Sequence, residues 1–217
     1  MRFDLSKPIL YLITRGVSTE TTTPKSPEFR QILEQVSAAV AARLDLIQLR
    51  EKRLTARVLF ELSEQSAALT RGSATRLLVN DRADVAAAAG ADGVHLPAQS
   101  IDAATIRRTF GDDFLIGVST HSLAEAQIAK EDGADFVVFG PVFATPSKEN
   151  YGPPTGLRNL ESVAKQLAPF PVLALGGIEV TNARECLRAG ASGIAGISLF
   201  ADLERLDEIV RTLRVRM

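Results

Sequence analysis

The stretch Ala-Ala-Ala-Ala-Gly-Ala-Asp-Gly-Val-His-Leu at residues 86–96 decides the fold class of this chain. Alanines favour a helix, Gly90 can end that helix because glycine adopts the left-handed conformation cheaply, and an apolar run follows at once. Similar sequence motifs recur at residues 132–135 and at residues 189–193. The recurrence predicts repeated helix-to-strand turns on the lower face of a structure built from β-α units.

Short apolar runs alternate with longer helical patterns along the whole chain. Most of the short runs are continuously apolar, which is typical of parallel strands that are buried on both faces. We therefore expect eight strands, at Ile9–Ile13, Asp45–Arg50, Arg76–Asn80, Gly93–Leu96, Phe114–Val118, Phe136–Phe139, Pro171–Leu175 and Gly193–Ile197.

Helices are expected between and after these strands, at Glu28–Arg43, Thr55–Arg71, Arg82–Ala89, Asp102–Phe110, Leu123–Asp132, Leu157–Leu167, Thr181–Ala189 and Leu203–Leu213. Strict alternation leaves two main architectures, a closed barrel or an open doubly wound sheet. Eight units in about 215 residues favour the barrel. No linker divides the chain, so we predict an α/β protein with a single (β/α)8 TIM-barrel domain over residues 1–217.

The charge balance narrows the classes of partner. Lys and Arg total 25 and Asp and Glu total 26, which argues against nucleic-acid binding by a broad basic surface but leaves room for small anionic substrates. The single cysteine, Cys186, excludes an intrachain disulfide, and we expect it to be buried. No signal-like segment or apolar run of about 20 residues occurs, which predicts a soluble cytoplasmic protein without membrane contact. The sequence is compatible with a homo-oligomer and leaves the oligomeric state open.

Polar residues that follow the second strand should face the active site, because this is where barrel enzymes place their catalytic groups. Alternation puts Gln48, Arg50 and Lys52 on one side. These cations could simply pair with Glu51 or with a neighbouring helix. Their position at a strand end favours anion binding, since arginine offers a planar fork of donors to phosphate and lysine a point charge.

Asn80 and Asp81 follow the third strand. Either residue could cap the next helix. In a barrel that binds phosphate, Asp81 could also hold Mg²⁺, which prefers carboxylate and phosphate oxygens. We favour the metal role for Asp81.

Ser119 follows the fifth strand, and after it come His121 and the pair Ser122 and Glu125, which can form a capping box. Ser119 should face the barrel mouth. His121 could move a proton as a neutral imidazole, whereas His95 at the fourth strand is expected to be a hydrogen-bonded core residue.

The loop after the sixth strand carries Thr145, Ser147 and Lys148, which suit a pyrophosphate better than a plain solvated turn. Gly176 and Gly177 follow the seventh strand, and Ile197 and Ser198 follow the eighth. Glycines there would let backbone N–H groups approach a phosphate, which barrels commonly bind at this position. The segment 16–27, rich in Thr, Ser and Pro, is expected to be a mobile loop that could act as a lid.

Taken in order, these segments resemble the thiamine-phosphate synthase family over nearly the whole chain. The motifs that carry the resemblance are Gln48-Leu49-Arg50-Glu51-Lys52, Asn80-Asp81-Arg82, Gly93-Val94-His95-Leu96, Gly117-Val118-Ser119-Thr120-His121, Gly140-Pro141-Val142-Phe143, Thr145-Pro146-Ser147-Lys148 and Gly176-Gly177-Ile178. The resemblance implies a (β/α)8 barrel. It also implies a Mg²⁺-dependent transferase that joins hydroxymethylpyrimidine diphosphate to a thiazole phosphate and releases pyrophosphate in thiamine biosynthesis.

The resemblance also implies roles for individual residues. Asp81 would bind Mg²⁺ and Gln48 would contact the pyrimidine. The leaving pyrophosphate would be held by Arg50, Lys52, Asn80, Ser119 and Lys148, with Ser119 and Lys148 as the catalytic pair. The thiazole phosphate would be held by Thr145, Ser147, Gly177, Ile197 and Ser198.

One position departs from the family. Ser100 stands where the family usually has an aspartate that provides a second Mg²⁺ ligand, and Asp102 is out of register and suited to cap a helix. The sequence around Ser100 and His121 is similar to that of the related thiazole tautomerase. That enzyme is a proton-transfer isomerase with a catalytic histidine at the position of His121. That enzyme does not retain Lys52 and Asp81 together, so we favour the synthase. A non-catalytic barrel that binds phosphorylated ligands is a third alternative.

Overall fold

Eight parallel strands close into a barrel, because β1 pairs with β2 on one side and with β8 on the other. The computed structural model describes residues 3–145 and 154–214. The strands are β1 (Ile9–Ile13), β2 (Leu46–Leu49), β3 (Arg76–Asn80), β4 (Gly93–Leu96), β5 (Leu115–Thr120), β6 (Phe136–Phe139), β7 (Val172–Ala174) and β8 (Gly193–Gly196). The predicted (β/α)8 TIM barrel is confirmed.

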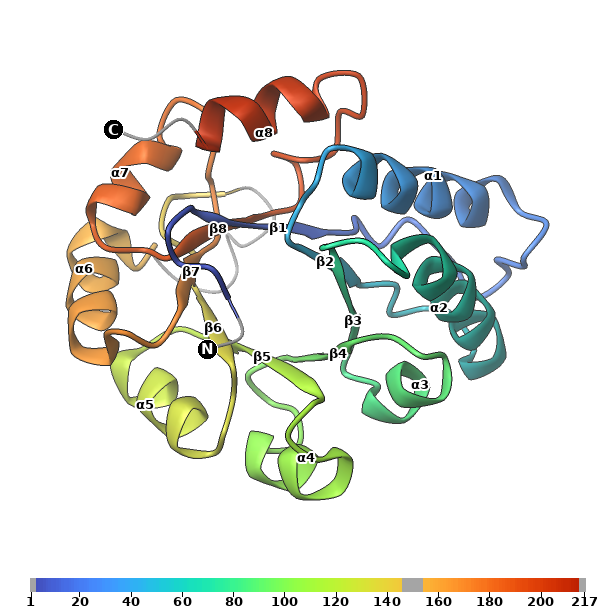
Figure 1. The fold of residues 1–217 in the computed structure, drawn as a ribbon, viewed down its shortest axis with the longest axis horizontal. Helices are drawn as coiled ribbons and strands as arrows, with labels where there is room; N and C mark the ends of the chain where they lie inside the picture. The colour runs from blue at the N-terminus through green and yellow to red at the C-terminus, as the bar shows by residue number, and fades with distance from the viewer. Residues whose placement is uncertain (1–2, 146–153, 215–217) are drawn as a thin grey trace.

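A helix follows each strand, and Figure 1 shows these helices as a ring around the barrel. They are α1 (Pro27–Ala41), α2 (Ala56–Thr70), α3 (Ala83–Ala88), α4 (Ala103–Phe110), α5 (Leu123–Glu131), α6 (Gly156–Leu167), α7 (Ala183–Arg188) and α8 (Leu206–Arg214). The largest shift from expectation is at α8, which begins at Leu206 instead of Leu203. The fifth strand also runs on to Thr120, which brings Ser119 into the sheet.

Side chains alternate between two apolar layers along each strand. One layer fills the barrel interior with Ile9, Tyr11, Ile13, Leu46, Leu78, Leu115, Phe136, Val138, Leu173 and Ala195. The other lies between the strands and the helices and forms the larger cluster. This alternation fixes which polar side chains at the strand ends point into the barrel.

The repeated glycine turns end helices as predicted. Gly90, Gly133 and Gly190 follow α3, α5 and α7 with φ of +71°, +86° and +89°. In this left-handed region an L side chain is disfavoured, so glycine stops each helix and turns the chain into the next strand. Cys186 is fully buried in α7, as expected, and burial raises the pKa of its thiol to about 11. No helix within the described residues is long and apolar enough to span a membrane.

Replacing Gly93 should destabilise the barrel strongly. A Cβ on Gly93 would lie 1.9 Å from the carbonyl oxygen of Leu115, its partner on β5, so β4 and β5 would have to separate. We expect Gly93→Ala to lower the free energy of unfolding by about 3 kcal/mol in urea denaturation. Gly72→Ala is the control: it adds backbone strain at φ +78° with no atom within 4 Å, for about 1 kcal/mol. Equal losses in both variants would contradict the packing explanation.

Candidate active site

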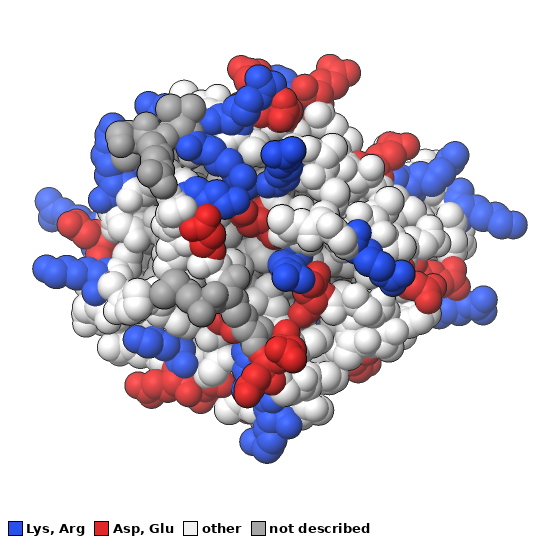
Figure 2. Space-filling view, viewed as in Figure 1, with Lys and Arg blue, Asp and Glu red and all other residues white. Residues whose placement is uncertain are grey.

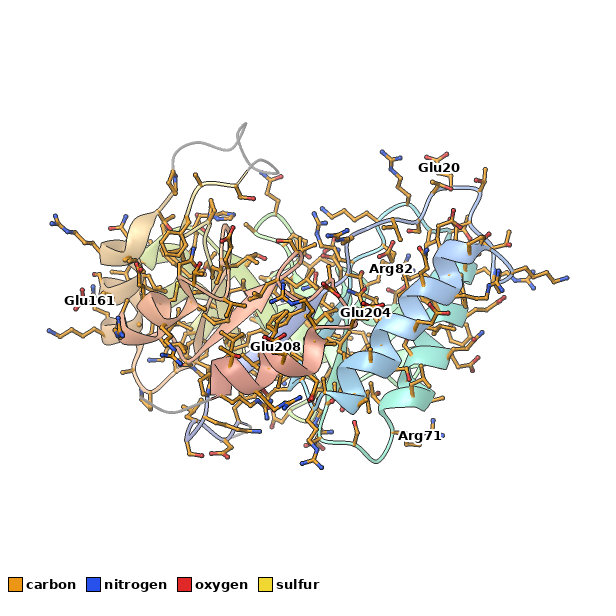
Figure 3. All side chains as sticks on the ribbon, turned by 90° about the horizontal axis from the view of Figure 1, so that it is seen from above. Glu20, Arg71, Arg82, Glu161, Glu204 and Glu208 are labelled. Atoms are coloured by element: carbon orange, nitrogen blue, oxygen red, sulfur yellow. The ribbon has the colours of Figure 1, made fainter. Side chains whose placement is uncertain are left out.

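The polar residues singled out in the sequence gather at one rim of the barrel, where the strands end. Figure 3 views the molecule from the side, with Glu20, in the loop after β1, at this end and Arg71, after α2, at the other. Gln48 shares the inward side of β2 with Leu46, and Asn80 shares the inward side of β3 with Leu78. In a barrel of this type, this rim is where catalytic groups are placed.

Gln48 and Arg50 rise from the interior of β2 toward the rim. Gln48 is buried, and its Nε2 donates to the Tyr11 hydroxyl at 2.8 Å. Neither Arg50 nor Lys52 forms an ion pair with any residue in 3–145 or 154–214. Lys52 is exposed and Arg50 is half-buried. The alternative in which Glu51 neutralises these two cations is therefore wrong, and both cations lie at the rim without an ion-pair partner among the described residues.

Glu51 points away from the cations and holds the loop that follows β1. Its buried carboxylate accepts hydrogen bonds from Thr14 Oγ1 at 2.7 Å and from the Gly16 N–H at 3.1 Å. It also accepts from the Ser18 N–H at 3.0 Å and from Ser18 Oγ at 2.6 Å. Thr14 Oγ1 in turn accepts from the Arg50 N–H at 2.8 Å. The acid thus ties β1 to β2 beside Arg50.

The segment 16–27, expected to be a mobile lid, is anchored instead. Its first residues bind Glu51, and the Thr19 N–H donates to Thr22 Oγ1 at 2.9 Å. The Thr23 N–H donates to Ser26 Oγ at 2.9 Å, just before α1 begins. The threonine and serine side chains that suggested mobility in the sequence instead close turns within the segment.

A cavity of about 260 Å³ lies between the ends of β2 and β3, with Lys52, Asn80 and Asp81 in its lining. Asp81 does not cap α3, because the cap residue is Arg82, whose side chain makes no capping hydrogen bond and binds the Asp84 carboxylate instead. Asp81 instead has φ +59°, and its N–H donates to the His95 carbonyl oxygen at 2.9 Å. A positive φ is uncommon outside glycine, and such strain is found most often at functional sites.

Ser100 and Asp81 are in direct contact. The Ser100 hydroxyl donates a hydrogen bond to the Asp81 carboxylate, which is exposed at the rim. Asp102 is the cap of α4 and accepts from the Thr105 N–H at 2.6 Å, as expected. The residue at the family's second acidic position therefore lies beside Asp81, but it brings a hydroxyl instead of a negative charge.

Ser119 and His95 form a hydrogen-bonded pair near the carboxyl ends of β5 and β4. Ser100 and Ser119 line a second cavity, also of about 260 Å³, between these strands and the helices α4 and α5. His95 Nε2 lies 2.8 Å from Ser119 Oγ, and the ring is buried, as expected of a hydrogen-bonded core residue. Burial, and secondarily the charge of Arg50, lowers the pKa of His95 to about 3. The ring is therefore neutral near pH 7.

His121 lies just after β5 and is exposed. Its Nδ1 is hydrogen-bonded to the Gly140 carbonyl oxygen, and its N–H donates to Glu125 Oε2 at 2.6 Å. Ser122 caps α5 by accepting from the Glu125 N–H at 3.2 Å. The capping-box prediction is thus half right, because Glu125 binds the N–H of His121 in place of that of the cap residue.

The ends of β7 and β8 form a third polar part of the rim. Gly176 and Gly177 have φ of +101° and +63°, and a Cβ on either would collide with residues 141–144. The Gly177 and Ile178 N–H groups donate no hydrogen bond within the described residues. Ser198 is exposed and Ile197 is half-buried after β8. The glycines therefore allow close packing, and two backbone N–H groups at this end of the barrel have no acceptor among the described residues.

Thr145 is half-buried at the end of the described part of the loop after β6. The predicted site residues Ser147 and Lys148 lie outside the described residues. Within 3–145 and 154–214 no group of three or more His, Cys, Asp or Glu side chains could hold a metal ion. On the face drawn in Figure 2, Lys and Arg are interspersed with Asp and Glu, in keeping with the balanced net charge of -1.

The fold is a (β/α)8 barrel with polar and cationic side chains gathered at one rim, and comparison with known proteins gives its family. A family model described as thiamine monophosphate synthase matches residues 12–200. A thiamine-phosphate synthase of Roseiflexus castenholzii is 42% identical over 194 residues, which cover 89% of this chain and 85% of that protein. One of Chloroflexus aurantiacus is 38% identical over 198 residues, covering 91% and 89% of the two chains.

Among solved structures, a thiamine phosphate pyrophosphorylase from Pyrococcus furiosus aligns with a TM-score of 0.76 at 32% identity. The alignment covers 94% of this chain and 96% of that one. The chain belongs to the thiamine monophosphate synthase family.

Two features of the rim were not predicted from the sequence. The role of Glu51 as an acceptor for the first loop depends on a contact between residues 33 to 37 positions apart. The signal that could have found it is the cluster of hydroxyls at Thr14 and Ser18, which needs an acceptor once it is buried. The hydrogen bond between Ser100 and Asp81 gave no local signal.

Removing the Glu51 carboxylate should loosen the first loop. In Glu51→Ala the two buried hydroxyls and two N–H groups lose their acceptor, so we expect a loss of about 2 kcal/mol or more in the free energy of unfolding. Limited proteolysis should cut within residues 16–27 faster than in the wild type. Glu20→Ala, an exposed acid in the same loop, should change stability by less than about 0.5 kcal/mol. Wild-type stability and proteolysis in Glu51→Ala would refute the anchoring role.

Proposed function

We propose that this chain is a cytoplasmic, Mg²⁺-dependent thiamine-phosphate synthase, which couples hydroxymethylpyrimidine diphosphate to a thiazole phosphate. The observation that carries the proposal is the set of polar groups at adjacent strand ends, where Arg50 and Lys52 form no ion pair within the described residues and lie near Asn80 and Asp81. The family membership and the named relatives support the coupling reaction. The proposal assigns phosphorylated small molecules as substrates and no nucleic acid or membrane.

The diphosphate would lie over the ends of β2, β3 and β5. Arg50, Lys52, Asn80 and Ser119 would bind it, joined by Lys148 from outside the described residues. Gln48 uses its Nε2 on Tyr11, which leaves its amide oxygen to accept from the pyrimidine amino group. The thiazole phosphate would take the free N–H groups at Gly177 and Ile178, with Thr145, Ser147, Ile197 and Ser198 around it.

The reaction needs charge stabilisation more than acid or base catalysis. The bond between the pyrimidine methylene carbon and the diphosphate oxygen breaks, and its electron pair leaves with pyrophosphate. The 4-amino group of the ring stabilises the resulting cation. The lone pair of the thiazole nitrogen then forms the new C–N bond without a proton transfer. Cations and N–H donors aimed at the departing oxygens lower the barrier because that is where negative charge develops.

The donor set at Asp81 fits a metal ion that is shared with the substrate. Mg²⁺ is often bound through one or two carboxylates, with substrate phosphate oxygens and water completing the shell. Asp81 provides one exposed carboxylate and Ser100 a hydroxyl beside it. When bound, the ion would neutralise charge on the diphosphate. Within the described residues no group of three or more His, Cys, Asp or Glu side chains could hold the ion, so it should bind tightly only together with the diphosphate.

The direct test is thiamine phosphate formation by the purified protein, given both phosphorylated substrates, first with Mg²⁺ and then with excess chelator. We expect product with Mg²⁺ and none with the chelator. Asp81→Asn should lower turnover at least about tenfold, and Asp84→Asn, which removes an exposed acid on α3, should not. Product formation that survives the chelator would contradict the metal part of the proposal. A lack of turnover on any substrate pair would leave the non-catalytic ligand-binding barrel.

Restoring an acid at position 100 should tighten metal binding. Ser100→Asp places a second carboxylate beside Asp81, so we expect Mg²⁺ or Mn²⁺ to bind about tenfold more tightly in the presence of pyrophosphate. Isothermal titration calorimetry would measure this without any catalytic readout. Ser100→Ala removes the hydroxyl alone and should not tighten binding. Unchanged affinity in Ser100→Asp would place the ion elsewhere.

A second function is favoured by one observation at His121. Its Nδ1 faces the Gly140 carbonyl, which can only accept, so in the neutral ring the proton sits on Nδ1 and Nε2 is left as a base. Such a base suits the proton-transfer isomerisation of a thiazole carboxylate phosphate. This isomerisation would survive a chelator and be lost in His121→Gln, whereas the synthase reaction would behave in the opposite way.

A further inference from the structure

His95 is a polar group of the barrel interior to which the proposed function gives no role. It lies on β4 opposite Gly117, and its Nε2 reaches Ser119 Oγ, two residues further along β5. The ring is only 3% exposed and packs against Tyr11 and Phe136, with ring centroids at 5.7 Å and 6.2 Å. A polar ring in such surroundings needs a reason, since an apolar side chain would pack there at lower cost.

The surroundings of Nδ1 indicate which nitrogen carries the proton. Nδ1 is buried and has no hydrogen-bond partner among the described residues. A Cβ added to Gly117 would lie 2.9 Å from it, so the group that faces Nδ1 from this side is a C–H of Gly117. C–H groups carry a slight positive charge, so a nitrogen lone pair facing them is more favourable than an N–H facing them. A neutral imidazole has one N–H, so the proton belongs on Nε2.

This tautomer sets the direction of the Ser119 hydroxyl. If Nε2–H donates to Ser119 Oγ, one lone pair of the oxygen is used and the O–H proton must turn away from the ring. Ser119 Oγ has no other hydrogen-bond partner in the described part of the chain. Its proton is then free for an oxygen of a ligand in the barrel mouth, beside the positive charge of Arg50.

We infer that His95 is a positioning residue that fixes the Ser119 hydroxyl as a hydrogen-bond donor toward the substrate's diphosphate. The inference rests on the proposed function for the identity of the ligand. A donor that is already oriented costs no reorganisation when the anion binds or when charge develops on it. The opposite tautomer would make Ser119 donate to His95 and would present a lone pair to the anion.

The test uses inorganic pyrophosphate with Mg²⁺ as the probe, so it does not depend on turnover. We expect His95→Leu to weaken pyrophosphate binding about fivefold to tenfold by calorimetry, because the hydroxyl loses its fixed orientation. His95→Gln, whose amide N–H can replace Nε2–H, should stay within about twofold of the wild type. In a Ser119→Ala background, His95→Leu should have no further effect. Ser63→Ala, a buried serine on α2, is the control that should leave binding unchanged.

Nitrogen-15 NMR of the histidines gives a second readout that needs no variant to fold. It should show Nε2 of His95 protonated and Nδ1 unprotonated. A protonated Nδ1 would overturn the inference. So would a His95→Leu effect that persists in the Ser119→Ala background, or a wild type that does not bind pyrophosphate. If the wild type and variants bind pyrophosphate as expected but the wild type forms no thiamine phosphate, only the proposed synthase reaction would be contradicted.

Discussion

The Glu51 carboxylate is the interaction on which the organisation of the rim depends. It is buried, and it accepts four hydrogen bonds from the residues that follow β1. A buried charge of this kind is costly unless its partners are complete, and here donors from Thr14, Gly16 and Ser18 surround it. Because the Glu51 carboxylate is hydrogen-bonded to the loop, it does not neutralise Arg50 and Lys52, which flank it in the sequence.

The same interaction fixes the backbone that carries Arg50. Thr14 Oγ1 donates to Glu51 and accepts from the Arg50 N–H, so the end of β1 and the end of β2 are joined by a side-chain bridge. Alternation along β2 then points Gln48 and Arg50 into the barrel. On β3 and β5 the same rule places Asn80 and Ser119 inward, level with that charge. The placement of the proposed anion site thus follows from strand pairing and one buried acid.

Much of this arrangement could be predicted from the sequence, because it follows from local rules. Hydrophobic periodicity gave the eight strands, and the glycines at 90, 133 and 190 gave the helix ends. The inward direction of Gln48 and the capping roles of Asp102 and Ser122 are likewise set within a few residues. Each of these features depends on residues that are close together in the chain.

The structural features that were not predicted from the sequence depend on contacts between residues far apart in the chain. Segment 16–27 has the composition of a mobile loop, yet Glu51 anchors it from more than thirty positions away. Asp81 has the sequence of a helix cap, yet its backbone takes a positive φ and its carboxylate meets Ser100. In both cases the alternative partner becomes available only once the barrel closes, which no pattern of neighbouring residues can indicate.

In the proposed magnesium site, the contact between Ser100 and Asp81 would determine how tightly a metal ion binds without substrate. Two carboxylates at one site attract a divalent cation but repel each other when it is absent. A hydroxyl removes that repulsion and gives Asp81 a hydrogen bond instead. The proposed site would then depend on the diphosphate to complete the negative charge that an ion requires. Metal and substrate binding should therefore be more strongly coupled here than in a barrel with two acids at these positions.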